Sequence, residues 1–396
     1  MRKILIAMFV FVSCFTTKAF SDGHSIKMGI ILGFTGPIES LTPAMAASAE
    51  LAFKEASDSG SLLGGKTISV ERADSTCVDS AAATTAAEGL VSGGVVAIMG
   101  ADCSGVTGAI ATNVAVPNGV VMISPSATSP GLTTLDDKGF FFRTAPSDAR
   151  GGQILADITK DRKVKSVAIT YTNNDYGKGL ADVYAAAVKA HGIKVTTVAA
   201  HEDGKADYSA EVGALAAAGG DLLVVAGYVD QGGDGIMRAS IDTGAFDLYH
   251  FPDGMISTNL EDNFGNDING SQGQHPGTDS PGAASVAAMG EANGFDGSSP
   301  FAPESYDAAA LIMLAMQAAG SSSSADYASK VMDVANAPGV QIFPGELAKG
   351  LKILADGGEI DYVGGSAVEL IGPGESAGAY RQIEIKVGKI TTMKYR

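Results

Sequence analysis

Two segments of the chain place hydroxyl groups where a small carboxylate could be held. In residues 98–111 an expected strand runs into an expected helix, and Ser104 lies near the start of that helix. Exposed backbone N–H groups and the helix dipole favour an anion at such a position. Residues 122–133 form a polar loop after another strand, with backbone and hydroxyl partners at Ser126, Ala127 and Thr128. Taken alone, helix capping by Ser104 and an ordinary turn at 122–133 are the simpler interpretations.

A positively charged group would need a different partner, and Asp253 is the candidate. It lies in residues 250–255, which, like residues 226–231, end a strand of the second block. A carboxylate there could receive an ammonium group in a charge-assisted hydrogen bond. Because Asp before Gly commonly forms a turn, a structural role is the alternative. From the residues alone, a carboxylate site at the hydroxyl groups and an ammonium site at Asp253 therefore remain open beside these structural roles.

The usual catalytic and metal-binding motifs do not occur in the sequence. Neither Ser104 nor Ser126 lies in Gly-x-Ser-x-Gly, although both follow strand ends, where α/β proteins place active groups. The five histidines have no metal-binding spacing, and only His250 is near enough to Asp253 to border a site. We expect no catalytic residue, metal or cofactor. A calcium ion at the Asx-rich residues 261–269 is an alternative to a solvated turn.

The elements that must position these residues follow an α/β rhythm. From Ile26 onward, short β-rich runs alternate with Ala-rich segments of helical period, which predicts parallel-rich sheets covered by helices. The expected strands are 26–32, 67–74, 95–99, 119–124, 166–171, 194–200 and 221–227, followed by a β-like tail over 362–395. The expected helices lie near 43–58, 79–92, 104–115, 147–161, 177–191, 206–218, 232–243, 282–292, 303–320 and 325–337.

The length and the rhythm together predict two lobes. A chain of 396 residues exceeds the size at which one core usually stops growing. The rhythm runs in two blocks that end near 143–146 and 263–276, and three crossings between lobes would leave a hinge and a cleft. We expect lobe 1 to comprise residues 22–146 and 274–356, and lobe 2 to comprise residues 147–273 and 357–396.

The first 21 residues have the pattern of an export signal. A basic start, an apolar stretch of about a dozen residues and a small-x-small site at 19–21 predict cleavage, and lipid attachment at Cys14 is the less favoured alternative. Removing three basic residues with the signal takes the net charge from −17 to −20. Such an acidic protein repels phosphate backbones and anionic lipid, so we expect neither nucleic acid nor a membrane surface as the ligand.

Two cysteines remain after the signal, Cys77 and Cys103. In an oxidising compartment they are expected to form a disulfide, and two buried thiols are the alternative. Closing a loop of roughly 25 residues would stabilise the fold by about 3 kcal/mol in the chain-entropy model.

Several motifs together resemble the leucine/isoleucine/valine-type amino-acid-binding proteins that serve ABC importers. The resemblance covers nearly the whole chain after the signal. Its motifs are MGIILGFTGP (28–37), DSTCVDS (74–80), GADCSG (100–105), MISPSATSPGLT (122–133), FRTAPSD (142–148), YTNNDYGKGLAD (171–182) and ESYDAAALI (304–312). It implies the type I periplasmic binding protein fold, with two Rossmann-like lobes, and a disulfide between Cys77 and Cys103.

The resemblance also assigns roles to the candidate residues. It implies that the solute's α-carboxylate is held by Ser104, Ser126 and Thr128, with Ala127 in packing contact. Asp253 would receive the α-ammonium group, and Tyr228 and Tyr176 would line the pocket. Leu41 replaces an aromatic residue common in the family, and Asp253 is one methylene shorter than the usual glutamate. A branched aliphatic solute is therefore not predicted, and other amino acids and amide or urea-like compounds remain open.

The function predicted in this way is a monomeric periplasmic receptor that closes around its solute and delivers it to the membrane permease of an ABC importer. A ligand-sensing module for a signalling receptor is the main alternative, and what copurifies with the protein would separate the two. An enzyme is a third possibility, which turnover of the bound solute would reveal.

Overall fold

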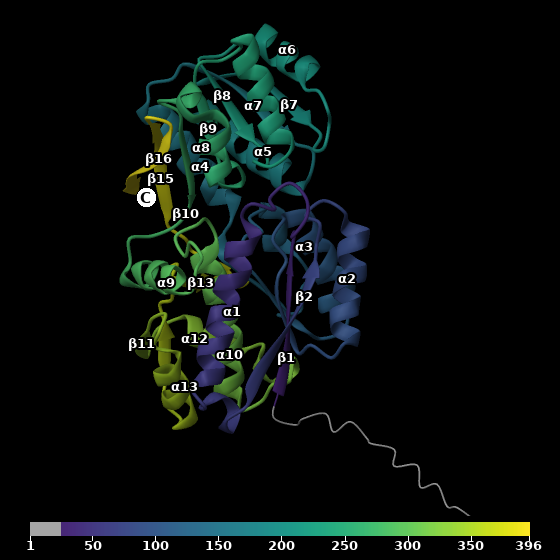
Figure 1. Cartoon of the computed structure of the whole chain (residues 1–396), viewed down its shortest axis with the longest axis vertical. Helices are drawn as coiled ribbons and strands as arrows, with labels where there is room; N and C mark the ends of the chain where they lie inside the picture. The colour runs from purple at the N-terminus through teal and green to yellow at the C-terminus, as the bar shows by residue number, and fades with distance from the viewer. Residues whose placement is uncertain (1–24) are drawn as a thin grey trace, which may run out of the picture.

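The computed structural model describes residues 25–396 and shows two α/β lobes joined by several chain segments (Figure 1). Each lobe is built on a seven-stranded sheet with helices packed on it. The α/β class and the two-lobed architecture predicted from the sequence are confirmed. The expected export signal and Cys14 lie outside the described residues. Within residues 25–396, no helix has the length and apolar character needed to cross a bilayer.

The sheet of lobe 1 has the strand order β13-β14-β5-β4-β3-β1-β2 and is parallel except for β13. Strands β3 and β4 are buried along their whole length, and apart from Ser124 at the end of β4 their residues are non-polar instead of alternating with polar ones. The strands are β1 (Ser25–Leu32), β2 (Thr67–Asp74), β3 (Ala97–Gly100), β4 (Val121–Ser124), β5 (Phe141–Pro146), β13 (Leu370–Ile371) and β14 (Glu375–Ser376).

Helix α10 forms the centre of the helical layer of lobe 1, where it is buried over most of its length and packs against α1. Its run of small and apolar residues allows this close approach. The helices of this lobe are α1 (Thr42–Asp58), α2 (Ser80–Ser92), α3 (Ser104–Ile110), α9 (Pro281–Ala292), α10 (Ala302–Ala319), α11 (Ser324–Tyr327), α12 (Lys330–Ala335) and α13 (Leu347–Ala355). The single helix expected near 325–337 is thus two short helices. A small parallel pair, β11 (Val340–Ile342) and β12 (Ile360–Tyr362), lies beside them.

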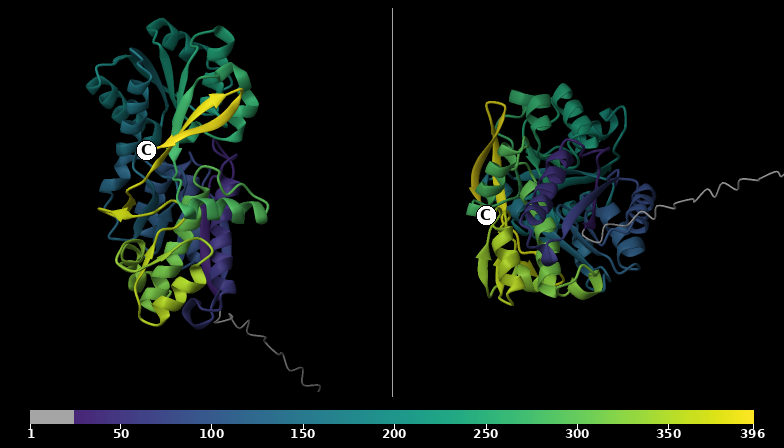
Figure 2. Two further views of the ribbon diagram at one scale, coloured as in Figure 1. Left: turned by 90° about the vertical axis from the view of Figure 1, so that its left-hand side faces the viewer. Right: turned by 60° about the horizontal axis from the view of Figure 1, so that its bottom comes forward.

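The sheet of lobe 2 has the strand order β16-β15-β10-β9-β8-β6-β7, with an antiparallel hairpin of β15 and β16 at one edge (Figure 2). Its strands are β6 (Ser166–Thr172), β7 (Lys194–His201), β8 (Leu222–Ala226), β9 (Tyr249–Phe251), β10 (Gln272–Pro276), β15 (Tyr380–Lys386) and β16 (Lys389–Tyr395). Its helices are α4 (Asp148–Asp161), α5 (Asp175–Ala190), α6 (Ser209–Ala218), α7 (Gly232–Thr243) and α8 (Thr258–Phe264).

The chain passes between the lobes three times, but two of the expected boundaries need correction. The first crossing follows β5, as expected. The second follows β10, so residues 274–276 belong to the sheet of lobe 2. The third lies between β14 and β15, so residues 357–376 stay with lobe 1 instead of joining lobe 2. The reason is that β12 pairs with β11, and β14 pairs with the free edge of β5.

Residues 261–269, which the sequence offered as a calcium loop, hold the β15–β16 hairpin in place. Glu261 accepts a hydrogen bond from the N–H of Ile390 and forms an ion pair with Lys389 at 2.8 Å. Asn269 accepts one from the N–H of Gly388 at 2.9 Å. Over residues 25–396, no cluster of three or more His, Cys, Asp or Glu could hold a metal ion.

Candidate functional site

A small pocket lies where the carboxyl ends of strands from both sheets face each other. The space inside it that a water-sized molecule could occupy is about 20 Å³, so the pocket is tightly packed in this arrangement. Five of the seven predicted ligand residues come together there: Ser104 and Ser126 from lobe 1, and Tyr176, Tyr228 and Asp253 from lobe 2. Ala127 and Thr128 do not line it. The remaining lining residues are Ile38, Leu41, Asp102, Cys103, Gly254 and Phe301.

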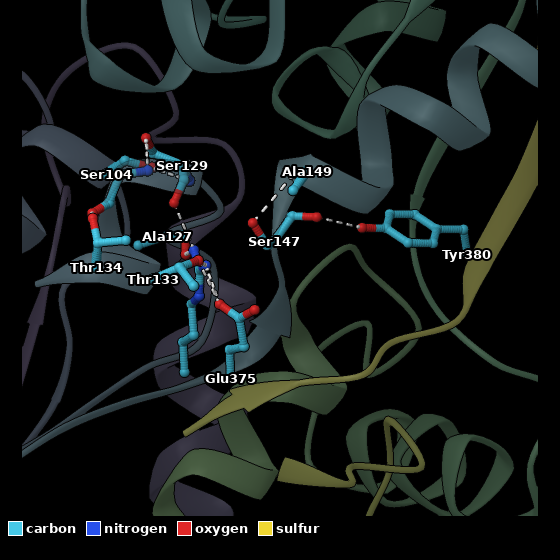
Figure 3. A network of polar contacts seen from close by, with 11 residues as sticks. Ser104, Ala127, Ser129, Thr133, Thr134, Ser147, Ala149, Glu375 and Tyr380 are labelled. Atoms are coloured by element: carbon cyan, nitrogen blue, oxygen red, sulfur yellow. Dashed lines mark hydrogen bonds and ion pairs between the residues drawn. The ribbon is translucent and has the colours of Figure 1, made fainter. Parts of the chain in front are cut away.

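Ser104 is the first residue of α3 and does not cap it. The N-cap position belongs to Cys103, which makes no side-chain capping bond. The Oγ atom of Ser104 instead accepts a hydrogen bond of 3.0 Å from the N–H of Ser129 (Figure 3). This bond ties the loop after β4 to the start of α3, so both hydroxyl-bearing segments predicted from the sequence form one wall of the pocket.

Within that wall, the three residues of the Ser-Ala-Thr loop have different surroundings. Ser126 reaches the pocket, and its Oγ donates to the carbonyl of Asp102 at 3.1 Å. Ala127 is fully buried, and its N–H donates to Ser124 Oγ. Thr128 is 2% exposed, and its Oγ1 has no hydrogen-bond partner within the described residues. The predicted packing role suits Ala127, while the Thr128 hydroxyl lies beside the carboxyl group of Asp148 and does not line the pocket.

Arg143, which was not predicted from the sequence, holds this loop in place. Its guanidinium donates to the carbonyl oxygens of Ala127 and Ser129 at 3.0 and 2.9 Å. It also donates to Thr133 Oγ1 and forms a 2.6 Å ion pair with Glu375, the partner supplied by β14. Figure 3 labels Thr133 and Glu375. The guanidinium is 1% exposed, so its charge is balanced by Glu375 in a place that water hardly reaches.

On the side of lobe 2, Tyr176 orients the carboxyl group of Asp253. The Tyr176 hydroxyl donates to Oδ1 of Asp253 at 2.5 Å, and the N–H of Gly254 donates to the same oxygen at 2.8 Å. The ring of Tyr176 stacks on Tyr228 with 5.2 Å between the ring centroids. A Cβ atom at position 254 would lie 2.7 Å from the carbonyl oxygen of Gly227 and 2.9 Å from the Tyr176 hydroxyl, so the turn requires glycine.

A second buried carboxyl group, that of Asp148, lies near Asp253. Asp148 begins α4 at the first crossing, and its N–H donates to the carbonyl of Thr128 at 2.8 Å. Burial and the charge of Asp253 raise the pKa of Asp148 well above its ordinary value. Burial also raises the pKa of Asp253, against the lowering effect of the hydrogen bonds from Tyr176 and Gly254. Two such neighbours resist simultaneous ionisation unless a cation joins them.

A third carboxyl group, that of Asp102, ties together the ends of three strands. It accepts hydrogen bonds from the N–H of Gly33 at 2.5 Å and the hydroxyl of Ser75 at 2.7 Å. The neighbouring Cys103 forms the predicted disulfide with Cys77, which is thereby confirmed. Burial raises the pKa of Asp102, and the hydrogen bonds oppose that shift.

The lobes also contact each other directly beside the pocket, through Asp230 of the loop after β8. Its N–H donates to the carbonyl of Pro37 at 3.1 Å, and its carboxylate accepts the N–H of Ser40 at 2.8 Å. Asn259 of lobe 2 donates to the other carboxylate oxygen at 2.7 Å. Farther along the interface, a Cβ atom at Gly179 would lie 2.9 Å from the ring of Pro130. The lobes are therefore in their closed arrangement.

The sequence left open that His250 borders the site. In the structure it does not line the pocket. It is fully buried in lobe 2, where its Nδ1 lies 3.1 Å from the hydroxyl of Thr159. Burial lowers its pKa well below the ordinary value, so the ring is neutral. It faces α4 because β9 alternates the direction of its side chains, which is invisible from the three-residue spacing to Asp253.

Comparison with known proteins identifies the family. The family described as "Periplasmic binding protein" matches residues 25–349, most of the chain. The chain belongs to this family. Its relatives include a protein of Brucella melitensis named "Leu/Ile/Val-binding protein homolog 3", which is 31% identical over 220 residues, or 55% of this chain. The alignment spans only 58% of that relative's own length.

Solved structures of the family have the same fold. A leucine-binding protein of Thermotoga maritima superposes with a TM-score of 0.77 at 20% identity, covering 93% of this chain and 98% of its own. A branched-chain amino acid transporter substrate-binding protein of Streptococcus pneumoniae, solved with isoleucine, gives a TM-score of 0.76 at 21% identity and covers 94% of this chain and 99% of its own. At these identities the likeness establishes the fold alone.

Proposed function

We propose that this chain is an extracytoplasmic receptor that closes around an amino acid or a related solute and presents it to the membrane permease of an ABC importer. The observation that carries this proposal is one pocket with hydroxyl groups from lobe 1 and the oriented carboxyl group of Asp253 from lobe 2. The names of the relatives support the same class of solute. The periplasm is the compartment that the family and the disulfide favour.

In this proposal each lobe binds one end of the solute. Ser104 donates its hydroxyl to the carboxylate, Ser126 joins it by turning its hydroxyl away from the carbonyl of Asp102, and Asp253 receives the ammonium group. Thr128 lies behind this wall, so it takes part only if its side chain moves toward the pocket. Because neither lobe alone satisfies both ends, the solute stabilises the closed form more than the open one. Tyr176 positions Asp253, and the stacked ring of Tyr228 closes the side of the pocket. The solute leaves unchanged, so the protein has no catalytic role.

Isothermal titration calorimetry of an Asp253→Asn variant tests the proposal. A charge-assisted hydrogen bond contributes about 1.5–3 kcal/mol, so the dissociation constant of an amino acid found by thermal-shift screening should rise about 10- to 150-fold. The control is Asp234→Asn on α7, because the partners of Asp234, Arg238 and Asn263, lie in its own lobe. Equal affinities of both variants and the parent protein would eliminate the role given to Asp253.

A further inference from the structure

The proposed pocket contains more carboxyl groups than a zwitterion needs. Asp102 lines it from lobe 1 and Asp253 from lobe 2, and each is 2% exposed. Asp148, also 2% exposed, feels the charge of Asp253 directly. One α-ammonium group can neutralise only one of these three carboxyl groups. The others must hold protons in the closed protein, or a second cation must enter with the solute.

The protein itself does not supply that second cation. Among the described residues, the lining of the pocket contains no Lys, Arg or His. The buried guanidinium of Arg143 acts on Asp148, but it is held by two loop carbonyls and paired with Glu375. The pocket is therefore balanced either by protons on these carboxyl groups or by a cation that the ligand brings.

The lining of the pocket offers a ligand cation one carboxyl group on each side. On the side of Asp253, the carboxyl group of Asp148 and the hydroxyl of Thr128 lie beside each other behind the lining of the pocket, so Asp253 is the acceptor that a ligand meets there. On the opposite side, the two hydrogen bonds from Gly33 and Ser75 fix the Asp102 carboxyl group. The backbone N–H groups of Asp102 and Cys103 also stabilise this carboxyl group, so a ligand cation would add to a carboxyl group that the protein already holds in place.

We propose that the solute is a cationic amino acid whose positively charged side chain is received by Asp102, while Asp253 receives its α-ammonium group. This proposal rests on the proposed function, because it concerns the same pocket. Apolar lining from Ile38, Leu41 and Phe301 suits the methylene stem of such a side chain. The net charge of −17 also draws cations toward the cleft and raises their rate of encounter.

Matched ligand pairs separate charge from shape. Arginine carries a guanidinium group where citrulline carries a neutral urea group of the same shape. Lysine carries an ammonium group that norleucine lacks. Calorimetry of the full-length protein at pH 8 should give arginine or lysine a dissociation constant at least tenfold below that of its neutral partner. Equal or tighter binding of the neutral partners, or of other neutral amino acids, overturns the cationic solute and leaves the proposed function standing. Failure of every amino acid in a full panel overturns both.

A variant of Asp102 tests whether this residue causes the preference for a cationic side chain. Asp102→Asn keeps an acceptor for Gly33 and a partner for Ser75 but removes the charge. It should weaken arginine binding at least tenfold and change citrulline binding less than threefold. The control is Asp74→Asn, since Asp74 binds Thr35 in the same group of loops without lining the pocket. A purely structural role of Asp102 would weaken both ligands equally, with a lowered melting temperature, and would overturn the assignment.

Discussion

Asp230 should control how readily the lobes close without touching the solute. Its carboxylate accepts the N–H of Ser40 and its own N–H donates to Pro37, so two hydrogen bonds join the lobes at one residue. An Asp230→Ala variant loses the first of them. Hydrogen bonds to charged groups contribute about 1.5–3 kcal/mol, and the partial exposure of Asp230 favours the lower end. About 1.5 kcal/mol corresponds to a tenfold shift from closed to open.

If the free protein is mostly open, every solute should lose the same factor of about ten in affinity, because the affinity scales with the closing equilibrium. Calorimetry with two solutes of different affinity measures this factor, and single-molecule fluorescence between labels on the two lobes measures the closed fraction. Asp234→Ala is the control, since Asp234 contacts only its own lobe. A loss of affinity that differs between the two solutes, or an unchanged closed fraction, would refute the proposed role of Asp230 in closure.

Three further predictions concern buried groups. Burial raises the pKa of Glu304 to about 8, so the folded protein holds a proton that the unfolded chain releases near 4.5, and stability should fall as the pH rises between these values. Glu304→Gln should remove this slope in denaturant titrations from pH 5 to 9. Replacing Cys77 and Cys103 by Ser should lower the unfolding free energy by about 3 kcal/mol, measured by urea titration. Burial raises the pKa of Asp253 to about 6, so an ammonium-bearing solute should bind up to about tenfold more weakly per unit as the pH falls below 6, and calorimetry of Asp253→Asn should lack this dependence.

The sequence predicted those parts of the site that depend on one strand and the loop after it. Parallel strands bring their carboxyl ends to one edge, which made the segments after them candidates, and the family resemblance placed Ser104 and Ser126 in one site. The disulfide partners lie in loops at the same edge. The separate surroundings of Ser126, Ala127 and Thr128 were not predictable, because the guanidinium of Arg143 and the start of α4 decide them, and both meet the loop only in three dimensions.

The missed elements are short or lack periodicity. Strands β13 and β14 have two residues each, which is too few for an alternating pattern, so the predicted last crossing lies too early in the chain. Strand β10 has the sequence QGQHP, and its polar side chains are buried instead of alternating with apolar ones. Asp102 and Asp148 were not predicted as site residues, because an acidic residue near the start of a helix usually stabilises the helix end. Only their burial in the folded chain distinguishes them from caps.

The buried carboxyl groups also give the empty protein a physical reason to open. Asp148 stands at the first residue of α4, where the chain leaves lobe 1, and its N–H holds the Thr128 loop of that lobe. Closing the cleft without a ligand removes water from Asp148 and Asp253 together, so at least one of them must take up a proton or be repelled. A cation between them removes that cost at the hinge itself. The ammonium group that Asp253 receives is thus also the charge on which closure depends.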